Sequence, residues 1–323
     1  MVNFIVSTSA SAAKKLASYL KMAAMLTRQD SFTGFDPYKL MGVKVTDNII
    51  GHGSYATVLE LEYMGLKCAG KKIHDVLLKQ DSTYIAGRFG QECRLLAQIR
   101  HPNIVQFLGV FFTEGEEVPI LVMEYLPTNL KACIEVKGIL PQSTSYSILH
   151  DIALALCYLH SQEPPIIHRD LSANNILLTA NMKAKISDLG MARIVQLNPL
   201  QVSYMTETPG TPIYMPPEVM IANPSYDTSI DEFSYGVLII HVLTGKWPEP
   251  QCSQIRMEGG KMIPVSEAER RRIFLQEIGS EHPLMDLILR CIDNDPKQRA
   301  NANEIMQIIT RIIAAKQVSQ HLQ

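Results

Sequence analysis

The sequence predicts an α+β fold of two lobes, a small β-rich lobe followed by a larger helical one. The chain has 323 residues, which suits two lobes, or one domain of roughly 250–300 residues with an extension. Between residues 41 and 123 the apolar pattern is mostly short strands broken by turns, with one helix. After residue 124 helical periodicity dominates. Clefts between such units are where ligands bind.

The order of expected elements follows from apolar spacing and turn residues. Strands are expected at 43–50, 57–64, 66–73, 104–112 and 120–125. The main helix of the first lobe is expected at 84–100, where apolar residues recur at helical spacing. Further helices are expected at 143–161, 231–244, 267–278, 282–293 and 303–315. We therefore place the two lobes at 41–123 and 124–315, with a C-terminal tail at 316–323.

Composition is that of a soluble globular protein, with 46% hydrophobic and 19% charged residues. The net charge of −2 argues against nucleic acid as a partner. The six cysteines have no paired short spacing, which argues against a zinc site or a disulfide framework. A reducing compartment is favoured, and we expect the protein in the cytoplasm. No apolar run reaches the ~18 residues that a membrane-spanning helix needs.

Residues 1–40 form a separate N-terminal extension. The first 29 residues contain no Asp or Glu, and Lys14, Lys21 and Arg28 fall on one side of a helix. A targeting peptide or a membrane-surface helix in residues 1–29 is one interpretation. We favour a basic amphipathic or disordered segment, because only one Arg is present and no cleavage site stands out.

A glycine turn opens the β-rich lobe, in the run from Ile50 to Val58. Gly51 and Gly53 carry no Cβ, so the turn can approach a phosphate closely. A dinucleotide-binding fold needs a helix directly after such a turn, whereas a β-rich stretch follows here. The G-K-[ST] ending of a P-loop is also missing.

A lysine follows one strand later, at the end of Cys68-Ala69-Gly70-Lys71. Adjacent strand residues face opposite sides, so the small Ala69 shares a face with Lys71 and not with Lys72. An ammonium there can lie under phosphates that the glycine turn covers. Glu92, on the helix that follows, is positioned to hold Lys71.

The most informative run is Ile167-His168-Arg169-Asp170-Leu171-Ser172-Ala173-Asn174-Asn175, followed by Asp188-Leu189-Gly190. Phosphoryl transfer needs magnesium to neutralise phosphate oxygens and a group that orients the attacking hydroxyl. Asn175 and Asp188 supply hard oxygen ligands from two neighbouring loops. Asp170 is then free to accept the hydroxyl proton.

Together these segments resemble the eukaryotic protein kinases over roughly residues 43–315. The glycine turn is similar to G-x-G-x-x-G-x-V, with Ala56 in place of the third Gly, and His168–Asn175 matches H-R-D-L-x-x-x-N. Asp188-Leu189-Gly190 resembles D-F-G. Two more segments resemble family motifs, Pro216-Pro217-Glu218 (A-P-E) and Asp231–Gly236 (D-x-W-S-x-G). The resemblance implies a bilobal protein-kinase-like fold.

The resemblance implies an enzyme that uses ATP and Mg²⁺. The implied catalytic residues are Asp170 as base, Lys71 paired with Glu92, and Asn175 and Asp188 as metal ligands. The implied ATP-binding residues are Ile50, Gly51, Gly53, Ala56, Val58, Ala69, Lys71, Met123, Glu124, Tyr125, Leu126 and Leu177. Among them Met123 is the gatekeeper and residues 124–126 are the hinge. Leu96, Phe107, Leu189 and His168 are expected to stack as an apolar column.

The acceptor hydroxyl is indicated by the segment before Glu218. Gly210-Thr211-Pro212-Ile213-Tyr214-Met215 resembles the G-T-x-x-Y-M of Ser/Thr kinases, and Thr211 is implied to line the substrate groove. Ser172 stands where Ser/Thr kinases usually carry Lys, so slow turnover is possible. The mixture resembles the tyrosine-kinase-like branch, which mostly phosphorylates Ser or Thr of proteins. Tyrosine or dual specificity stays an alternative.

The resemblance also implies regulation by phosphorylation of the activation segment, about residues 188–218. Arg169 precedes the base and is expected to pair with a phosphate there. The candidate acceptors are Ser203, Tyr204, Thr206 and Thr208, with Thr206 or Thr208 preferred. Arg299 is expected to pair with Glu218.

Two rival interpretations use the same fold or a related one. A pseudokinase that binds nucleotide without turnover is favoured by Ala56, Gly70 and Ser172. It is opposed by the five intact catalytic residues. A small-molecule kinase is disfavoured by residues 210–218, which build a groove for a polypeptide.

Overall fold

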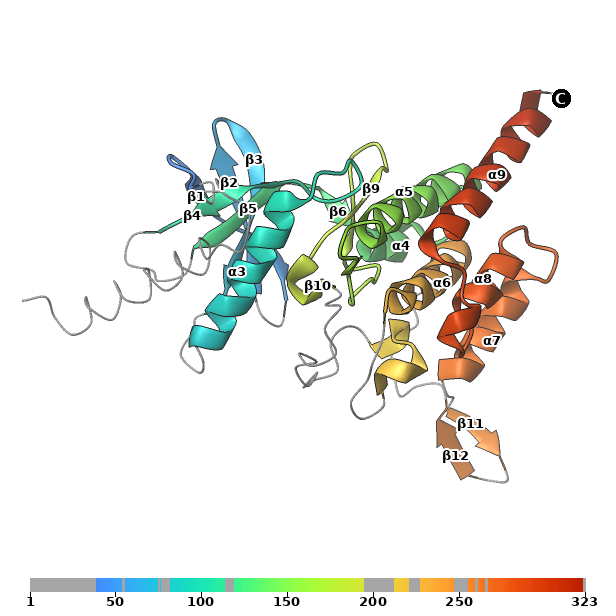
Figure 1. Cartoon of the computed structure of the whole chain (residues 1–323). Helices are drawn as coiled ribbons and strands as arrows, with labels where there is room; N and C mark the ends of the chain where they lie inside the picture. The colour runs from blue at the N-terminus through green and yellow to red at the C-terminus, as the bar shows by residue number, and fades with distance from the viewer. Residues whose placement is uncertain are drawn as a thin grey trace, which may run out of the picture. The chain divides into compact units, whose positions relative to one another are not determined.

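The structure is a computed structural model, and it falls into two compact units (Figure 1). It describes residues 39–53, 56–74, 76, 82–113, 119–194, 212–220, 227–246, 255–258, 261–264 and 267–321. Unit 1 ends at Arg100 and also includes Val105–Tyr125. Unit 2 consists of His101–Ile104 and the chain from Leu126 onward. The basic segment at residues 1–29 lies outside the described residues.

Unit 1 is built on one five-stranded antiparallel sheet. Its strands are β1 (Lys44–His52), β2 (Ala56–Tyr63), β3 (Leu66–Ile73), β4 (Phe107–Phe111) and β5 (Ile120–Glu124), in the order β1-β2-β3-β5-β4. The helix α3 (Ser82–Gln98) follows β3 and lies beside this sheet (Figure 1). Phe89, Cys93 and Leu96 on α3 are buried, as their helical spacing predicts.

One face of the sheet packs a small apolar core of Leu40, Val43, Leu61, Cys68, Ile120 and Val122. Gly70 is on this face, and a Cβ at that position would lie 2.4 Å from Leu61 Cδ1 and 2.8 Å from Ile120 Cγ2. No larger residue fits without moving these side chains. Gly70 is thus a packing glycine, which removes one of the sequence features that favoured a pseudokinase.

Unit 2 is mainly helical. Its helices are α4 (Leu130–Lys137), α5 (Gln142–His160), α6 (Ser229–Thr244), α7 (Glu267–Ile278), α8 (Met285–Cys291) and α9 (Ala302–His321). Its short strands are β6 (Thr128–Asn129), β7 (Ile166–Ile167), β8 (Ile176–Leu178), β9 (Ala184–Ile186), β10 (Arg193–Ile194), β11 (Ile255–Glu258) and β12 (Lys261–Pro264). A β-sheet unit and a helical unit confirm the predicted α+β class.

The centre of unit 2 is α6, which is buried on nearly all sides. A helix that is apolar all round belongs inside a protein, and α5, α7 and α8 pack against it. It ends at Gly245, whose φ of 64° is the left-handed conformation that glycine adopts most easily. The buried start of α6 carries two acids, Asp231 and Glu232.

Several elements differ from the sequence-based expectation. The helix α4 was not predicted; it begins after Asn129, whose side chain accepts a hydrogen bond from the Ala132 amide. The predicted tail at 316–323 is helical as far as His321, because α9 packs along α5 and Lys316 lies 4.6 Å from the Tyr146 ring centroid. Across the described part of the chain, no helix has both the length and the apolar character to cross a membrane.

Candidate active site

In unit 1, one sheet face carries the predicted nucleotide-binding residues. Val58 and Leu121 are the register partners of Lys71, and Met123 is the partner of Ala69. Since residues two apart on a strand share a face, all five side chains lie on the face opposite the Gly70 core. Val58, Lys71 and Met123 are only partly buried. This face therefore offers apolar side chains beside the Lys71 ammonium group.

The predicted ion pair between Lys71 and Glu92 is present. Lys71 Nζ lies 2.8 Å from Glu92 Oε1 and 3.1 Å from Oε2. The two side chains are 16% and 6% exposed, so water screens the pair little. Lys72 is the register partner of Thr57 and faces the other side of the sheet. The alternation argument thus selected the lysine that α3 holds.

The glycine turn closes with a hydrogen bond from the Gly53 amide to the Ala56 carbonyl, 2.8 Å long. A Cβ on Gly51 would lie 3.5 Å from Val58 Cβ, an ordinary contact. Packing within unit 1 therefore does not require glycine at 51. Ala56, in contrast, is 5% exposed and pairs with Ile73 in regular sheet, so an alanine suits its position in the strand.

The predicted hinge, residues 124–126, begins at the last residue of β5. The Glu124 amide donates to the Gln106 carbonyl at 3.0 Å, and Glu124 Oε1 accepts from the Gln106 amide at 2.8 Å. Lys67 Nζ lies 4.2 Å from the Tyr125 ring centroid. These contacts fix the backbone just before the chain leaves unit 1. Ile50 at the end of β1 is 38% exposed, and Leu126 is buried in unit 2.

In unit 2, the loop from His168 to Asn175 is held by Asp231 at the start of α6. Asp231 Oδ2 accepts from the His168 amide at 2.8 Å, and Oδ1 accepts from the Arg169 amide at 2.9 Å. Arg169 has a φ of 71°. A left-handed non-glycine residue costs roughly 1–2 kcal/mol, so Asp231 stabilises a strained turn directly before Asp170.

Asp170 and Asn175 are brought together inside this loop. Asn175 Nδ2 donates to the Asp170 carbonyl at 2.7 Å and to Asp170 Oδ2 at 2.9 Å. His168 Nδ1 accepts from the Asp170 amide at 3.3 Å. Hydrogen bonds therefore hold both the amide and the carbonyl of Asp170. Its Oδ2 is oriented by the neutral side-chain amide of Asn175, which does not neutralise the carboxylate.

Asp188 is placed beside the same loop by the hairpin of β8 and β9. Ile176 pairs with Ile186, so Asn175 and Ser187 follow on as neighbours. The Asn175 carbonyl accepts from the Ser187 amide at 2.8 Å and from Ser187 Oγ at 3.0 Å. His168 Nε2 donates to the Ser187 carbonyl at 2.9 Å. An amide side chain and a carboxylate on adjacent turns fit the oxygen ligands that magnesium prefers.

Asp188 itself has a φ of 59°, and its Oδ1 accepts from the Gly190 amide at 3.2 Å. Leu189, which takes the place of Phe in the motif, is 1% exposed. His168 is fully buried in unit 2, while Leu96 and Phe107 are buried in unit 1. Leu177 on β8 pairs with Asn129 and Lys185. The stacking of Leu96, Phe107, His168 and Leu189 into one column stays a prediction.

Ser172 is 1% exposed, and its Oγ has no hydrogen-bond partner among the described residues. Its neighbour Ala173 is anchored: the Ala173 amide donates to the Tyr214 hydroxyl at 3.1 Å, and its carbonyl accepts from the Lys131 amide at 3.1 Å. The loop therefore places a small buried hydroxyl where the family usually carries an ammonium group.

The segment that precedes Glu218 is described from Pro212 onward. Tyr214 is buried, and its hydroxyl lies 2.9 Å from His241 Nδ1 on α6. Arg299 pairs with Glu218 through both terminal guanidinium nitrogens, Nη1 and Nη2, with Nη2 2.9 Å from Oε2. The predicted Arg299–Glu218 pair is thus present. The proposed phosphate acceptors Ser203, Tyr204, Thr206 and Thr208, and also Thr211, lie outside the described residues.

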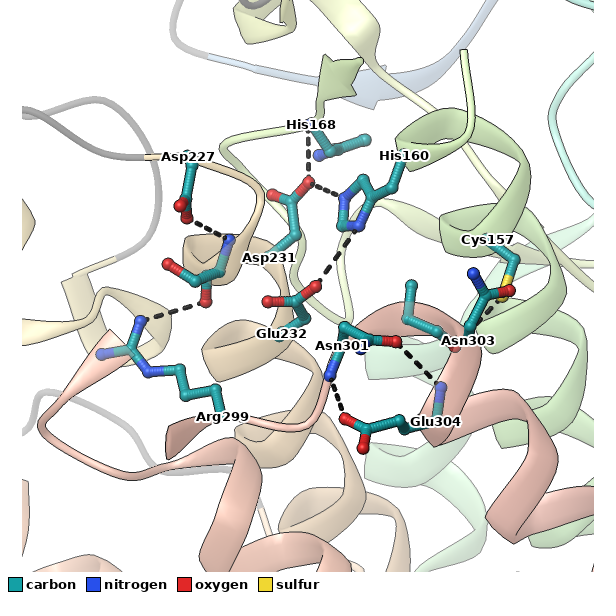
Figure 2. A network of polar contacts seen from close by, with 12 residues as sticks. Cys157, His160, His168, Asp227, Asp231, Glu232, Arg299, Asn301, Asn303 and Glu304 are labelled. Atoms are coloured by element: carbon teal, nitrogen blue, oxygen red, sulfur yellow. Dashed lines mark hydrogen bonds and ion pairs between the residues drawn. The ribbon is translucent and has the colours of Figure 1, made fainter. Parts of the chain in front are cut away.

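One polar cluster was missed by the sequence analysis. His160, the last residue of α5, lies between Asp231 and Glu232 beneath the His168–Asn175 loop (Figure 2). The two adjacent acids at the start of an apolar helix were the available signal, because buried acids need a partner. Their partner is 71 residues away along the chain, so the sequence did not identify it.

Comparison with known proteins gives a consistent result. The family model for the protein kinase domain matches residues 45–308. A probable serine/threonine-protein kinase of Dictyostelium discoideum is 32% identical over 274 residues, 84% of this chain and 42% of that protein. Serine/threonine-protein kinase VIK of Arabidopsis thaliana is 32% identical over 269 residues, 82% of this chain and 59% of that protein.

Salt tolerance receptor-like cytoplasmic kinase 1 of Oryza sativa subsp. japonica is 29% identical over 284 residues, 82% of this chain and 75% of that protein. The chain spans about half the length of the first two relatives. Protein kinase domains in general use ATP and a divalent metal and act on proteins. The matched region contains every motif described above, and the chain belongs to the protein kinase domain family.

Proposed function

We propose that this protein is an active ATP-dependent kinase that transfers the γ-phosphate to Ser or Thr hydroxyls of proteins. The observation that carries the proposal is the geometry of the His168–Asn175 loop. Asn175 contacts the Asp170 carboxylate at 2.9 Å, and Asp188 follows a turn that is hydrogen-bonded to the same loop. Such a fixed set of acid, amide and acid is what phosphoryl transfer requires of a protein.

In this proposal each side chain either stabilises a charge or positions a reacting group. Asp170 accepts the proton of the substrate hydroxyl as that hydroxyl attacks. Asn175 and Asp188 hold magnesium, which when bound neutralises phosphate oxygens. Lys71, kept in place by Glu92, contacts the phosphates of ATP. Val58, Ala69 and Met123 provide the apolar surface for adenine, and residues 124–126 provide its backbone hydrogen bonds.

The choice of Ser and Thr is supported by the names of two relatives, a probable serine/threonine-protein kinase and a serine/threonine-protein kinase. It is also supported by residues 210–215, of which Ile213, Tyr214 and Met215 are buried. We place the chain in the tyrosine-kinase-like group on the same grounds. Phosphorylation of residues 203–208 and its pairing with Arg169 belong to the proposal as its regulatory part.

The pseudokinase alternative depends on three departures from the family pattern. Gly70 and Ala56 have packing explanations within unit 1. Ser172 is the departure that still favours it, because a buried hydroxyl cannot replace an ammonium near the transferred phosphate. We therefore expect turnover that is slower than in kinases with Lys at this position, and not an absence of turnover.

For the whole protein we propose a cytoplasmic location and protein substrates, with no role in nucleic-acid binding. The cysteines at 68, 93, 133, 157 and 291 are free thiols, which supports a reducing compartment. Lobe boundaries at 41–123 and 124–315 are part of the same proposal. Membrane-surface contact through residues 1–29 stays the alternative that we do not favour.

The test is incorporation of labelled phosphate from Mg·ATP into a generic protein substrate, followed by identification of the modified residue. Asp170→Asn should reduce the rate by at least about 100-fold, since a positioned general base contributes roughly 10²–10⁴. Lys71→Met should lose activity, and the matched control Lys72→Met on the same strand should keep it. Phosphotyrosine as the product would overturn the Ser/Thr assignment. ATP binding without any incorporation would favour the pseudokinase.

A further inference from the structure

A lysine at the start of β3 contacts the ring of the middle residue of the predicted hinge. Lys67 Nζ lies 4.2 Å from the centroid of the Tyr125 ring and 2.8 Å from Glu60 Oε2 on β2. The side chains of Lys67 and Glu60 are 47% and 19% exposed, and Tyr125 is partly buried. The ammonium group therefore joins β2 to Tyr125, the last residue of unit 1.

The place of this contact follows from the register of the sheet. The pairing of β3 with β5 ends at Glu124, so Lys67 and Tyr125 come next in the same antiparallel alignment. Residues directly opposite one another on antiparallel strands point to the same face. Lys67 lies four residues before Lys71, on the face that carries the predicted nucleotide-binding side chains. The side-chain contact therefore continues the strand pairing one residue further, into the hinge.

The neighbouring charges direct Lys67 toward Glu60 and the hinge. Glu62 is directly opposite Lys67 in the register of β2 and β3, but it pairs with Lys44 Nζ at 2.8 Å. Glu60 lies diagonally across from Lys67 on the same face, at a separation that long side chains span. Lys67 Nζ thus contacts both the Glu60 carboxylate and the Tyr125 ring. An ammonium group over an aromatic face is attracted by the ring quadrupole.

Strand hydrogen bonds fix the hinge at Glu124, and the ring contact acts on the residue that follows. The Glu124 amide donates to the Gln106 carbonyl at 3.0 Å, and Glu124 Oε1 accepts from the Gln106 amide at 2.8 Å. In the proposed function the backbone of residues 124–126 forms hydrogen bonds with the adenine edge. Holding Tyr125 in place before the nucleotide arrives reduces the ordering cost of binding.

We propose that Lys67 is a positioning residue for ATP, which holds the hinge through the Tyr125 ring and is itself held by Glu60. Lys67 acts through Tyr125 and not by contact with the nucleotide. The inference rests on the proposed function, because adenine binding by the hinge is part of it. A held hinge stabilises bound ATP equally before and during phosphoryl transfer. The contact should therefore lower the KM for ATP and leave kcat nearly unchanged.

The experiment compares the full chain with Lys67→Met, Lys67→Arg, Tyr125→Leu and the double variant Lys67→Met with Tyr125→Leu. Methionine keeps an unbranched side chain without the charge, and arginine keeps a cation that can stack on the ring. The matched control is Lys44→Met on β1, which removes a lysine–glutamate pair of the same 2.8 Å length from the same sheet. Steady-state kinetics give kcat and KM for ATP, direct titration gives the Kd of Mg·ATP, and thermal unfolding gives Tm.

Lys67→Met should raise the KM and the Kd for ATP about three- to fivefold, the size expected for a partly exposed cation–ring contact. Its kcat should change by less than about 1.5-fold. Lys67→Arg should restore the KM to within about 1.5-fold of the wild type. In the background of Tyr125→Leu, Lys67→Met should have little further effect, because both changes remove the same contact. Lys44→Met should match the wild type in KM.

The inference is wrong if Lys67→Met and Lys44→Met change the KM for ATP alike, or if Lys67→Met lowers only Tm. It is also wrong if Lys67→Met lowers kcat as strongly as it raises KM. If the wild type binds Mg·ATP but transfers no more phosphate than Asp170→Asn, the proposed catalytic function fails instead. The Kd values then decide, and equal values for the wild type and Lys67→Met would overturn the role of Lys67. A chain that binds no Mg·ATP would overturn both. If Tyr125→Leu does not fold, the two Lys67 variants decide.

Discussion

Unit 2 buries one histidine on α6 and one that contacts α6, and their surroundings shift the two pKa values in opposite directions. His160 faces Asp231 and Glu232, and these acids raise its pKa to about 9 against the effect of burial. His241 on α6 lies 2.9 Å from the Tyr214 hydroxyl, and burial lowers its pKa to about 3. Both rings are buried, with the His160 side chain 8% exposed and His241 1% exposed. The adjacent charges, and not the depth of burial, therefore decide the protonation state.

The two rings also support the same loop in different ways. Asp231, which lies 2.9 Å from His160 Nε2, accepts from the His168 and Arg169 amides. The neutral His241 accepts from the Tyr214 hydroxyl, which accepts from the Ala173 amide at 3.1 Å. Burial also raises the pKa of Tyr214, so this phenol stays protonated and able to donate. An ionic support therefore holds the loop ahead of Asp170, and a neutral one holds it after Asp170.

The largest effect should come from removing the central charge of the ionic support. Asp231→Asn leaves the His160 imidazolium with one acid and weakens two amide contacts, so the free energy of unfolding should fall by about 3–5 kcal/mol. Denaturant titration at pH 7 measures this. The control is Asp227→Asn, where the exposed Asp227 accepts from the Ser229 amide at 2.9 Å, and about 1 kcal/mol should be lost. Equal losses in the two variants would mean that burial of the charge is unimportant.

Raising the pH should weaken the ionic support alone. The folded pKa of His160 is raised from 6.5 to about 9, so its contribution is complete below pH 6.5 and is lost as the pH rises through about 9. At ~1.4 kcal/mol per pKa unit, the free energy of unfolding should decline by about 3 kcal/mol between pH 6 and 9.5. Glu232→Gln should reduce this decline, and His150→Gln on α5, where Nε2 lies 3.1 Å from Thr310 Oγ1, should retain it. If Glu232→Gln shows a decline of the same size, a group other than His160 causes the loss of stability at alkaline pH.

Lowering the pH should weaken the neutral support by a smaller amount. The folded pKa of His241 is lowered from 6.5 to about 3, so its contribution is present above pH 6.5 and is lost as the pH falls. Between pH 7 and 5 the free energy of unfolding should decline by about 2 kcal/mol. His241→Gln keeps an acceptor for Tyr214 but does not titrate, so its decline should be smaller by that amount. If the free energy of unfolding of His241→Gln declines by the same amount between pH 7 and 5, a group other than His241 causes the decline.

Much of the fold was predictable because it depends on local patterns. Apolar spacing located α3, α5, α6 and α7 and the five strands of unit 1 to within a few residues, since apolar residues recur along the chain with the period of the element that contains them. Strand alternation alone distinguished Lys71 from Lys72. The short strands of unit 2 were not predicted, because two to four residues are too few to show a period.

For this protein the sequence alone determined the family, the five proposed catalytic residues and the pairs Lys71–Glu92 and Arg299–Glu218. These follow from the residue types in each motif and from the order and spacing of the motifs along the chain. Only the tertiary structure decided that Gly70 is a packing residue, that His160 lies between Asp231 and Glu232, and that His241 lies against Tyr214. The physical reason is that packing and charge state depend on neighbours far apart in the chain, which meet only when α5 and the loop after it pack on α6.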